Sequence, residues 1–370
     1  MKARHLPHFQ LPDELIERIQ WGLKQEASSL DQVQQLSRAV LDLSQKYIEN
    51  QELSALWTIS DHRKAYWAYY LPLNFLRLAS VIEEAIRLDF FHELRDVVDF
   101  GCGPGTGIVA WDFFSEYMPR VNYHLIDRDS TVQNILKKML SQFPSHFPYR
   151  IYLKEELIEA PSTQSLALFS YSLNETRQLP SNLDNYSHLL ILEPSTRHQG
   201  RQLMKWRQEL IDKGYFIWAP CTHQMKCPLE TKSKSDWCHD RILLQRPDWL
   251  VRIEDLLPLN NRSLTFSYLL ASRSPPAEIL GARVIGDTLT EKGKTRQALC
   301  RGPEREFLAW LKREGRVPVI ARGSKIDISD SAPTKGNEVR IGHEYELLSA
   351  HGMKPTKAAY EFFTSLAGKK

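Results

Sequence analysis

The chain has 370 residues, of which 42% are hydrophobic and 25% charged, and its formal net charge is +3. These values are typical of a globular protein with a full core and exclude a disordered or fibrous chain. The length fits one large α/β domain with additions at its ends. No apolar run approaches membrane-spanning length, and the first residues contain neither a secretory nor a transit segment. We therefore expect a protein of a reducing cytoplasm.

The first 90 residues are predicted to be helical. Apolar residues recur at helical spacing around Leu15, Ile19 and Leu23, and again through "AYWAYYLPLNFLRLASVIEEAI". Pro72 lies inside this second run and is expected to begin or kink a helix, because proline has no amide hydrogen to donate. The pattern therefore predicts an N-terminal helical region over residues 1–90.

From residue 94 onward, short apolar runs alternate with longer amphipathic stretches. The strand candidates are "DVVDFG", "YHLID", "YRIYL", "SLALFSYS", "HLLILEP" and "YFIWAP". Strands that alternate with helices indicate an α/β fold with a mostly parallel, doubly wound sheet. The runs "SLTFSYLLASR", "ARVIGD" and "RQALC" are expected to be its closing strands. The sequence thus predicts an α/β domain over residues 91–302.

A glycine-rich loop, "VVDFGCGPGTG" at 97–107, follows the first of these strands. Its glycines permit a tight turn and close approach of the backbone to a ligand before a helix begins. Asp127 ends the second strand, where a carboxylate can accept hydrogen bonds from ribose hydroxyls. No P-loop lysine follows, which disfavours a nucleoside triphosphate. A dinucleotide enzyme is the competing interpretation of such a loop.

The pattern D-x-G-x-G-x-G resembles the first motif of class I S-adenosylmethionine-dependent methyltransferases. In that family the glycines lie against the amino-acid part of the cofactor, and the strand-end acid holds the ribose. The resemblance implies a Rossmann-like fold. The cofactor-binding positions that it implies are Asp99, Gly101, Gly103, Gly105 and Asp127.

The fourth strand, within "LALFSYSLNE", ends where such methyltransferases commonly place catalytic groups. The Asn-Pro-Pro-Tyr or Asp-Pro-Pro-Tyr motif of many amine-methylating enzymes is absent. Asn174 and Glu175 are the candidate catalytic residues, because they could orient a nucleophile, although they could equally cap the next helix. The sequence assigns no other catalytic residue.

Three of the five cysteines lie in "APCTHQMKCPLETKSKSDWCHDR", residues 219–241. This segment is polar and interrupted by prolines, so it has no apolar face for buried thiols to fill. In a reducing compartment such a cluster is typical of a metal-binding or catalytic site. A fourth cysteine near the closing strands could complete a soft metal centre. The candidate ligands are Cys221, Cys227, Cys238 and Cys300. Zinc with His223 or His239 is an alternative, although paired C-x2-C steps are absent.

Several motifs carry a more specific resemblance. They are "EPST" at 193–196 with a following glycine at 200, "APCTHQMKCPL" at 219–229, "DWCHDR" at 236–241, "FSYLL" at 266–270 and "LC" at 299–300. Together they are similar to the methyltransferase-like family of small-subunit ribosome assembly proteins, known from mitochondria and with bacterial relatives. The resemblance runs from about residue 60 to 302.

This resemblance implies a 4Fe-4S cluster held by the four candidate cysteines. It also implies association with ribosomal RNA or the small ribosomal subunit precursor during its maturation. The expected location is the bacterial cytoplasm, or the mitochondrial matrix if the source is eukaryotic. The chain departs from the family in the long spacing created by "ETKSKS" and in the tail after residue 302, which has no counterpart.

The C-terminal region is basic. Residues 291–370 contain 16 Lys/Arg and 10 Asp/Glu, a net charge of +6. Residues 303–370 are predicted to be a basic extension of mixed helix and strand. Basic side chains also flank the cysteines, and they could meet RNA phosphates or simply be solvated. These side chains are Lys226, Lys232, Lys234, Arg241 and Arg246.

Three functions are consistent with these observations. The first is an S-adenosylmethionine-binding, iron-sulfur-containing methyltransferase-like protein that acts on ribosomal RNA or on the assembling small ribosomal subunit. The second is a non-catalytic ribosome assembly factor that uses the methyltransferase fold as a binding module. The third makes Cys221 a nucleophile in pyrimidine methylation, which leaves the other three cysteines unexplained.

Overall fold

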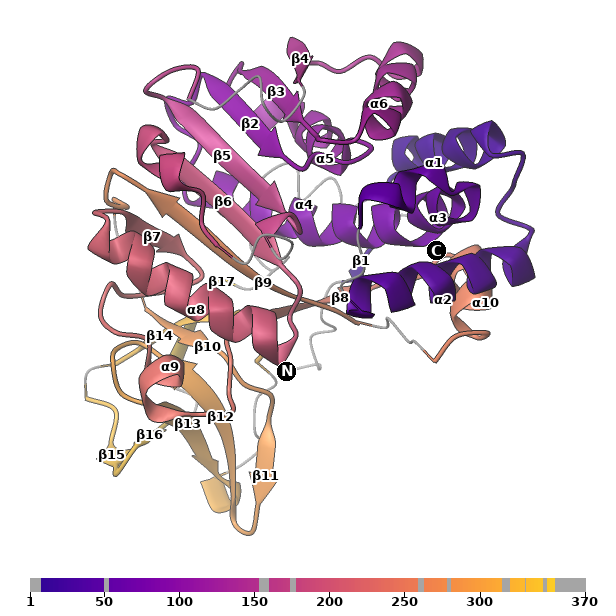
Figure 1. Cartoon of the computed structure of the whole chain (residues 1–370). Coiled ribbons are helices and arrows are strands. Elements are labelled where there is room, and N and C mark those ends of the chain that lie inside the picture. The colour runs from indigo at the N-terminus through magenta and orange to yellow at the C-terminus, as the bar shows by residue number, and fades with distance from the viewer. Residues whose placement is uncertain are drawn as a thin grey trace.

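The structure is a computed structural model of the chain, and it contains two β-sheets and an N-terminal layer of helices (Figure 1). The described residues are 8–49, 53–152, 160–173, 178–258, 263–277, 281–314, 320–329, 331–341 and 345–349. No helix in these ranges is long and apolar enough to cross a membrane.

The helices predicted at the N-terminus are present. They are α1 (Asp13–Gln25), α2 (Val33–Glu49), α3 (Ser60–Ala65) and α4 (Leu71–Arg87), with a 3-10 turn η1 (Leu53–Thr58) and a π-helical turn η2 (Tyr66–Tyr70). Pro72 lies in the first turn of α4, so it begins a helix as predicted. Leu15, Ile19 and Leu23 of α1 are buried in the main core. The apolar spacing therefore identified the face of α1 that packs on the protein.

The first sheet is Rossmann-like. Its strands are β1 (His8–Phe9), β2 (Asp96–Phe100), β3 (Asn122–Ile126), β4 (Tyr149–Tyr152), β5 (Ser165–Ser170), β6 (His188–Glu193), β7 (Phe216–Ala219), β8 (Asp240–Leu244) and β9 (Ser263–Ser272). The order is β1-β8-β9-β6-β5-β2-β3-β4, with β7 beside β9. Strands β2 to β6 run parallel to one another, and β9 runs antiparallel to β6 and β7. The predicted doubly wound sheet is confirmed.

The connections from β2 to β3 and from β4 to β5 lead to opposite sides of β2. This reversal opens a crevice at the carboxyl end of β2, which is where ligands bind in open α/β sheets. The glycine-rich loop follows β2 directly, so the chain order alone brings it to this crevice.

Helices cover both faces of the first sheet (Figure 1). The remaining helices are α5 (Thr106–Phe113), α6 (Ser130–Gln142), α8 (Arg197–Asp212), α9 (Pro228–Lys232) and α10 (Asp248–Glu254), with 3-10 turns η3 (Ser115–Tyr117), η4 (Ser181–Asn185) and η5 (Lys312–Glu314). Strand β5 shows why two cores form. Leu166 and Leu168 join the core beneath the N-terminal helices, whereas Ala167 and Phe169 join the core beneath α8.

The second sheet spans the C-terminal part of the described chain. Its strands are β10 (Ala282–Val284), β11 (Leu289–Glu291), β12 (Lys294–Cys300), β13 (Glu306–Leu311), β14 (Lys325–Ile328), β15 (Thr334–Lys335), β16 (Glu338–Arg340) and β17 (Tyr345–Ser349). The runs "ARVIGD" and "RQALC" are therefore strands, but they do not close the first sheet as expected. Because β12 pairs with β13, the second sheet also continues across the boundary predicted at residue 302. An apolar alternation predicts a strand, but it does not identify the pairing partner.

Candidate cofactor site and cysteine cavity

The glycine-rich loop has a backbone conformation that suits glycine. Gly101 and Gly103 have φ angles of 68° and 54°. A Cβ atom at Gly101 would lie 2.7 Å from the Cβ of Ser172, whereas the nearest atom to one at Gly103 is the Tyr66 hydroxyl at 3.7 Å. A side chain at Gly101 would therefore clash with the end of β5. At Gly103 the space is open, but the backbone angle disfavours any other residue.

Asp127 links the two loops that border the crevice. One carboxylate oxygen accepts a hydrogen bond from the Gly103 amide at 3.0 Å, and the other accepts one from the Asp129 amide at 2.9 Å. Burial raises the pKa of Asp127, and these two hydrogen bonds oppose that shift. A carboxylate has about four acceptor sites, so both oxygens can still accept hydrogen bonds from a ligand.

Asp99 lies beneath the loop. Its side chain is 1% exposed, and the Tyr123 hydroxyl donates to its Oδ2 at 3.2 Å. A Cβ at Gly107 would come within 2.1 Å of the same oxygen, so the carboxyl packs against the first turn of α5. Burial raises the pKa of Asp99 to about 7, while the hydrogen bond from Tyr123 lowers it. Asp99 therefore supports the loop from below, and its direct contact with a cofactor stays a prediction.

The candidate catalytic residues Asn174 and Glu175 lie outside the described residues. Just before them, Tyr171 has a φ of 64°, which is uncommon for a residue other than glycine. Ser172 Oγ is buried and has no hydrogen-bond partner among the described residues. The sequence contained no signal for this turn, because tyrosine does not favour a positive φ.

Four of the five cysteines line a single cavity of about 40 Å³, and they are the four candidate ligands Cys221, Cys227, Cys238 and Cys300. Apolar side chains form much of the remaining wall, among them Leu203, Met204, Leu229 and Ile285. The fifth cysteine, Cys102, is buried in the glycine-rich loop. The structure therefore groups the cysteines as the sequence analysis did.

Two separate parts of the chain contribute these cysteines. Cys221, Cys227 and Cys238 lie in the connection between β7 and β8, and both of these strands pair with β9. Cys300 ends β12 in the second sheet, opposite Arg283 of β10. The Thr222 hydroxyl also donates to the Cys300 carbonyl at 3.1 Å. The cavity thus lies where the cysteine segment meets the second sheet.

Arg207 of α8 lines the cavity and contacts one of its sulfur atoms. Its Nε donates to Cys221 Sγ at 3.0 Å and its Nη2 donates to the His223 carbonyl at 2.7 Å. Its Nη1 is buried and has no hydrogen-bond partner among the described residues. The side chain is 2% exposed, and no carboxylate of the described chain forms an ion pair with it. Burying a guanidinium without a negative charge nearby is costly.

The thiols and the neighbouring histidine respond to burial in opposite ways. Burial raises the pKa of the Cys238 and Cys300 thiols, and it lowers the pKa of His223 to about 4. His223 is therefore neutral at pH 7, and its Nε2 lies 3.4 Å from Cys300 Sγ. Within the described ranges, no three His, Cys, Asp or Glu side chains are gathered closely enough to hold one metal ion as they stand.

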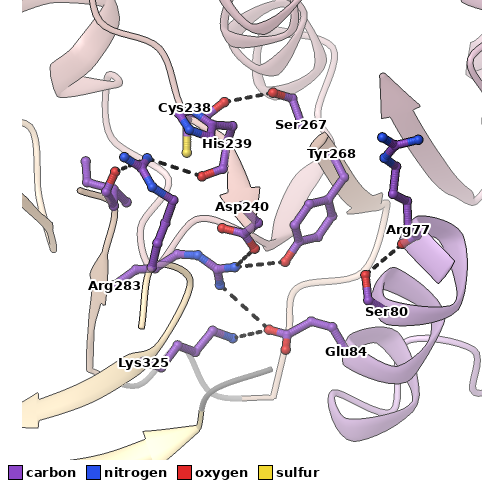
Figure 2. A network of polar contacts seen from close by, with 12 residues as sticks. Arg77, Ser80, Glu84, Cys238, His239, Asp240, Ser267, Tyr268, Arg283 and Lys325 are labelled. Carbon is purple, nitrogen blue, oxygen red and sulfur yellow. Dashed lines mark hydrogen bonds and ion pairs between the residues drawn. The ribbon is translucent and has the colours of Figure 1, made fainter. Parts of the chain in front are cut away.

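A buried network of charges adjoins the cavity (Figure 2). Arg283 forms an ion pair with Asp240, and its Nη2 donates to the Tyr268 hydroxyl at 3.1 Å. Its Nη1 lies 3.9 Å from Glu84 of α4, which also pairs with Lys325 of β14 at 3.0 Å. Glu84 also pairs with Arg87 of α4 at 2.6 Å, so each cation of the network has a carboxylate partner. The network therefore joins α4, the cysteine segment and the second sheet through neutralised charges.

The basic residues near the cysteines are mostly paired. Lys232 lies 3.4 Å from Glu304, Arg241 2.8 Å from Asp287 and Arg246 2.6 Å from Glu254. Lys226 and Lys234 are exposed and form no ion pair with the described residues. The net charge of the sequence therefore overstates the positive surface that is available to a partner.

The cysteine cavity is well separated from the crevice. Strands β2, β5, β6, β9 and β7 lie side by side in that order, and Cys221 follows β7. Four strand spacings of about 4.8 Å place β7 roughly 19 Å from β2. The cysteines and the glycine-rich loop are therefore two sites.

The chain is similar to several known proteins. The human mitochondrial ribosome assembly protein METTL17 is 26% identical over 243 residues, which are 53% of this chain and 52% of that protein. The chain thus spans about half the length of this curated relative. Similar solved structures include a putative RNA methyltransferase from Pyrococcus horikoshii, at 13% identity over 54% of this chain and 85% of that chain, with a TM-score of 0.32. Another is TrmK of M. capricolum, which is 10% identical and covers 54% of this chain and 70% of its own chain, with a TM-score of 0.30. TM-scores this low give no evidence on the fold beyond the strand order described above.

The family described as mitochondrial small ribosomal subunit Rsm22 matches residues 60–325, which is more than half of the chain. The matched range includes the glycine-rich loop, the cysteine segment and Cys300. The match also extends beyond residue 302, so the expectation that the tail has no counterpart is wrong for residues 303–325. The resemblance that the cysteine motifs indicated is thereby confirmed, and this chain belongs to the Rsm22 family.

Proposed function

We propose that this protein binds S-adenosylmethionine and a 4Fe-4S cluster and acts on ribosomal RNA or on the assembling small ribosomal subunit. The observation that carries the proposal is the cavity. Four cysteines from two parts of the chain line it together with Arg207, whose buried charge has no carboxylate partner in the described chain. A metal centre held by thiolates would supply the missing negative charge.

The residues present fit a cluster better than a single zinc ion. Zinc binds thiolates at about 2.3 Å in a tetrahedron, which brings the sulfur atoms to about 3.8 Å from one another. A cubane cluster takes one thiolate on each of its four irons, so its cysteines stand farther apart around a central space. Cys221, Cys227, Cys238 and Cys300 surround a cavity instead of converging on one point. A single zinc ion is the alternative, and metal analysis of the purified protein would distinguish it from an iron-sulfur cluster.

The crevice at β2 fits S-adenosylmethionine. The cofactor would supply an electrophilic methyl group. Asp127, already fixed by two amide donors, would accept hydrogen bonds from the ribose hydroxyls. The open space at Gly103 would admit the amino-acid part, and Asp99 would hold the loop in place from below.

The separation of the two sites limits what the cysteines can do. Cys221 follows β7, which lies four strand spacings or roughly 19 Å from β2, so Cys221 is remote from the glycine-rich loop that follows β2. This distance disfavours the interpretation of Cys221 as a nucleophile. The metal centre would instead tie the connection between β7 and β8 to β12, because its ligands come from both.

Association with the small ribosomal subunit is proposed from the description of the family and the name of the human relative. Lys226 and Lys234, which pair with no carboxylate in the described part of the chain, would meet RNA phosphates, together with Arg197 and Lys205 at exposed positions of α8. The non-catalytic assembly factor remains the second candidate, favoured by the absent amine-methylation motif. In a eukaryotic source the location would be the mitochondrial matrix.

The experiment purifies the protein without oxygen and measures iron, sulfide, zinc and visible absorption, then titrates S-adenosylmethionine by calorimetry. We expect about four irons per chain, a broad charge-transfer absorption, and binding that Gly103→Val abolishes. One colourless equivalent of zinc would refute the cluster. Binding without methyl transfer to small-subunit RNA would favour the assembly factor over the enzyme.

A further inference from the structure

We propose that Arg207 is the buried counter-ion of the cysteine cavity: it positions Cys221 and stabilises negative charge on the centre that the cavity holds. The inference rests on the proposed iron-sulfur function. It concerns a residue of α8, outside the cysteine motifs, that no cysteine pattern identifies.

Two hydrogen bonds fix the guanidinium of Arg207. Its Nε is bonded to Cys221 Sγ and its Nη2 to the His223 carbonyl, so the plane of the guanidinium is set by two donors. The third nitrogen, Nη1, is buried with no partner within the described chain, in a residue that lines the cavity. A guanidinium is planar and always charged, so it presents a directed positive charge to the cavity. The unused donor is available to a sulfur atom of an occupant.

Comparison with Arg283 shows what is unusual about Arg207. Both arginines are buried and both line the cavity. Arg283 is neutralised by Asp240 and Glu84, whereas the described groups that interact electrostatically with Arg207 are the thiols of Cys221, Cys227 and Cys300, of which Cys221 also accepts its hydrogen bond. The charge of Arg207 is therefore left for the occupant of the cavity.

A positive charge and hydrogen bonds to sulfur act on a cluster in the same direction. Both stabilise the more negative, reduced state, and they therefore raise the reduction potential. Removing the guanidinium should lower the potential and make the cluster easier to oxidise. If the charge is needed for assembly, its removal should also lower the iron content.

The test compares Arg207→Met and Arg207→Lys with the control Arg201→Met. Arg201 also lies on α8 and also anchors the cysteine segment, through Nη1 bonds to the carbonyls of Ser233 and Asp236 at 3.0 and 2.9 Å. It does not line the cavity. Each chain is purified anaerobically and checked for folding by circular dichroism. Iron and sulfide content, the midpoint potential and the rate of bleaching in air are then measured.

We expect Arg207→Met to lower the ratio of reduced to oxidised cluster about tenfold at the wild-type midpoint. This change corresponds to a midpoint potential that is lower by about 59 mV for one electron. Bleaching in air should be faster, Arg207→Lys should be intermediate, and Arg201→Met should match the wild type. A folded Arg207→Met chain without iron, beside a loaded Arg201→Met chain, also supports the proposal.

Two results would overturn it. One is an Arg207→Met chain that keeps the wild-type iron content and midpoint potential. The other is an equal loss of iron in Arg207→Met and Arg201→Met, which would mean that α8 packing is what matters. A wild-type protein that holds no iron refutes the proposed cluster itself, so the two failures are distinguishable.

Discussion

Replacing Asp99 with asparagine should change how stability depends on pH. Asp99 is buried under the glycine-rich loop, and burial raises its pKa from an ordinary value of 3.8 to about 7. Between these values the folded chain keeps a proton that the unfolded chain has lost. The free energy of unfolding therefore falls as pH rises from about 4 to about 7. Stability from this group is fully present below pH 4 and is lost above pH 7.

The magnitude follows from the two pKa values. One pKa unit corresponds to about 1.36 kcal/mol, so a pKa that moves from 3.8 to about 7 amounts to about 4 kcal/mol at most. Asparagine carries no charge at either pH, and its carbonyl can still accept from the Tyr123 hydroxyl. Asp99→Asn should therefore equal the wild type in stability near pH 4 and exceed it near pH 8.

The assay is urea unfolding of both chains from pH 4 to pH 8.5, followed by circular dichroism. Asp212→Asn is the control, because Asp212 is exposed on α8 and should leave the wild-type profile unchanged. Parallel profiles for the wild type and Asp99→Asn across pH 4 to 7 would refute the reasoning, since they would show that Asp99 is already ionised in the folded chain.

Three further outcomes follow from the sites. Asp127→Ala should weaken S-adenosylmethionine binding by about 1 to 3 kcal/mol in calorimetry, because ribose hydrogen bonds are lost; unchanged affinity would remove Asp127 from the site. Cys300→Ser should abolish iron binding while Cys102→Ser keeps it, as measured by iron content, and the reverse would mean that the ligands are misassigned. Lys226→Gln combined with Lys234→Gln should weaken binding to small-subunit RNA and flatten its salt dependence without changing cofactor affinity; an unaltered salt slope would place the RNA surface elsewhere.

Local patterns were sufficient to predict the parallel strands of the first sheet and to group the residues of both candidate sites. The alternation of apolar strands with amphipathic helices determines a parallel sheet, and a glycine-rich loop after a strand determines where its crevice opens. The cysteines could be grouped because spacing and polarity set them apart from a core. Each of these signals lies within a short stretch of chain.

Long-range partners could not be predicted. Strand β8 is short and directly follows Cys238, and its pairing with β9 is visible only in three dimensions. Salt bridges such as Arg241 with Asp287 join residues 46 positions apart, so the charge count could not reveal them. Arg207 is one basic residue on an amphipathic helix, and only the fold turns it toward the cavity.

The division of the cysteines between two sheets has a consequence for biosynthesis. Three of the proposed ligands are translated by residue 238, and the fourth follows 62 residues later at Cys300. At about 5 to 20 residues per second, the nascent chain carries three thiols without the fourth for about 3 to 12 seconds. The last two strands of the first sheet, β8 and β9, are translated within this interval, since β9 ends at Ser272. A centre that needs all four cysteines can therefore be completed only after the first sheet has been made, and iron delivery would act on a largely folded chain.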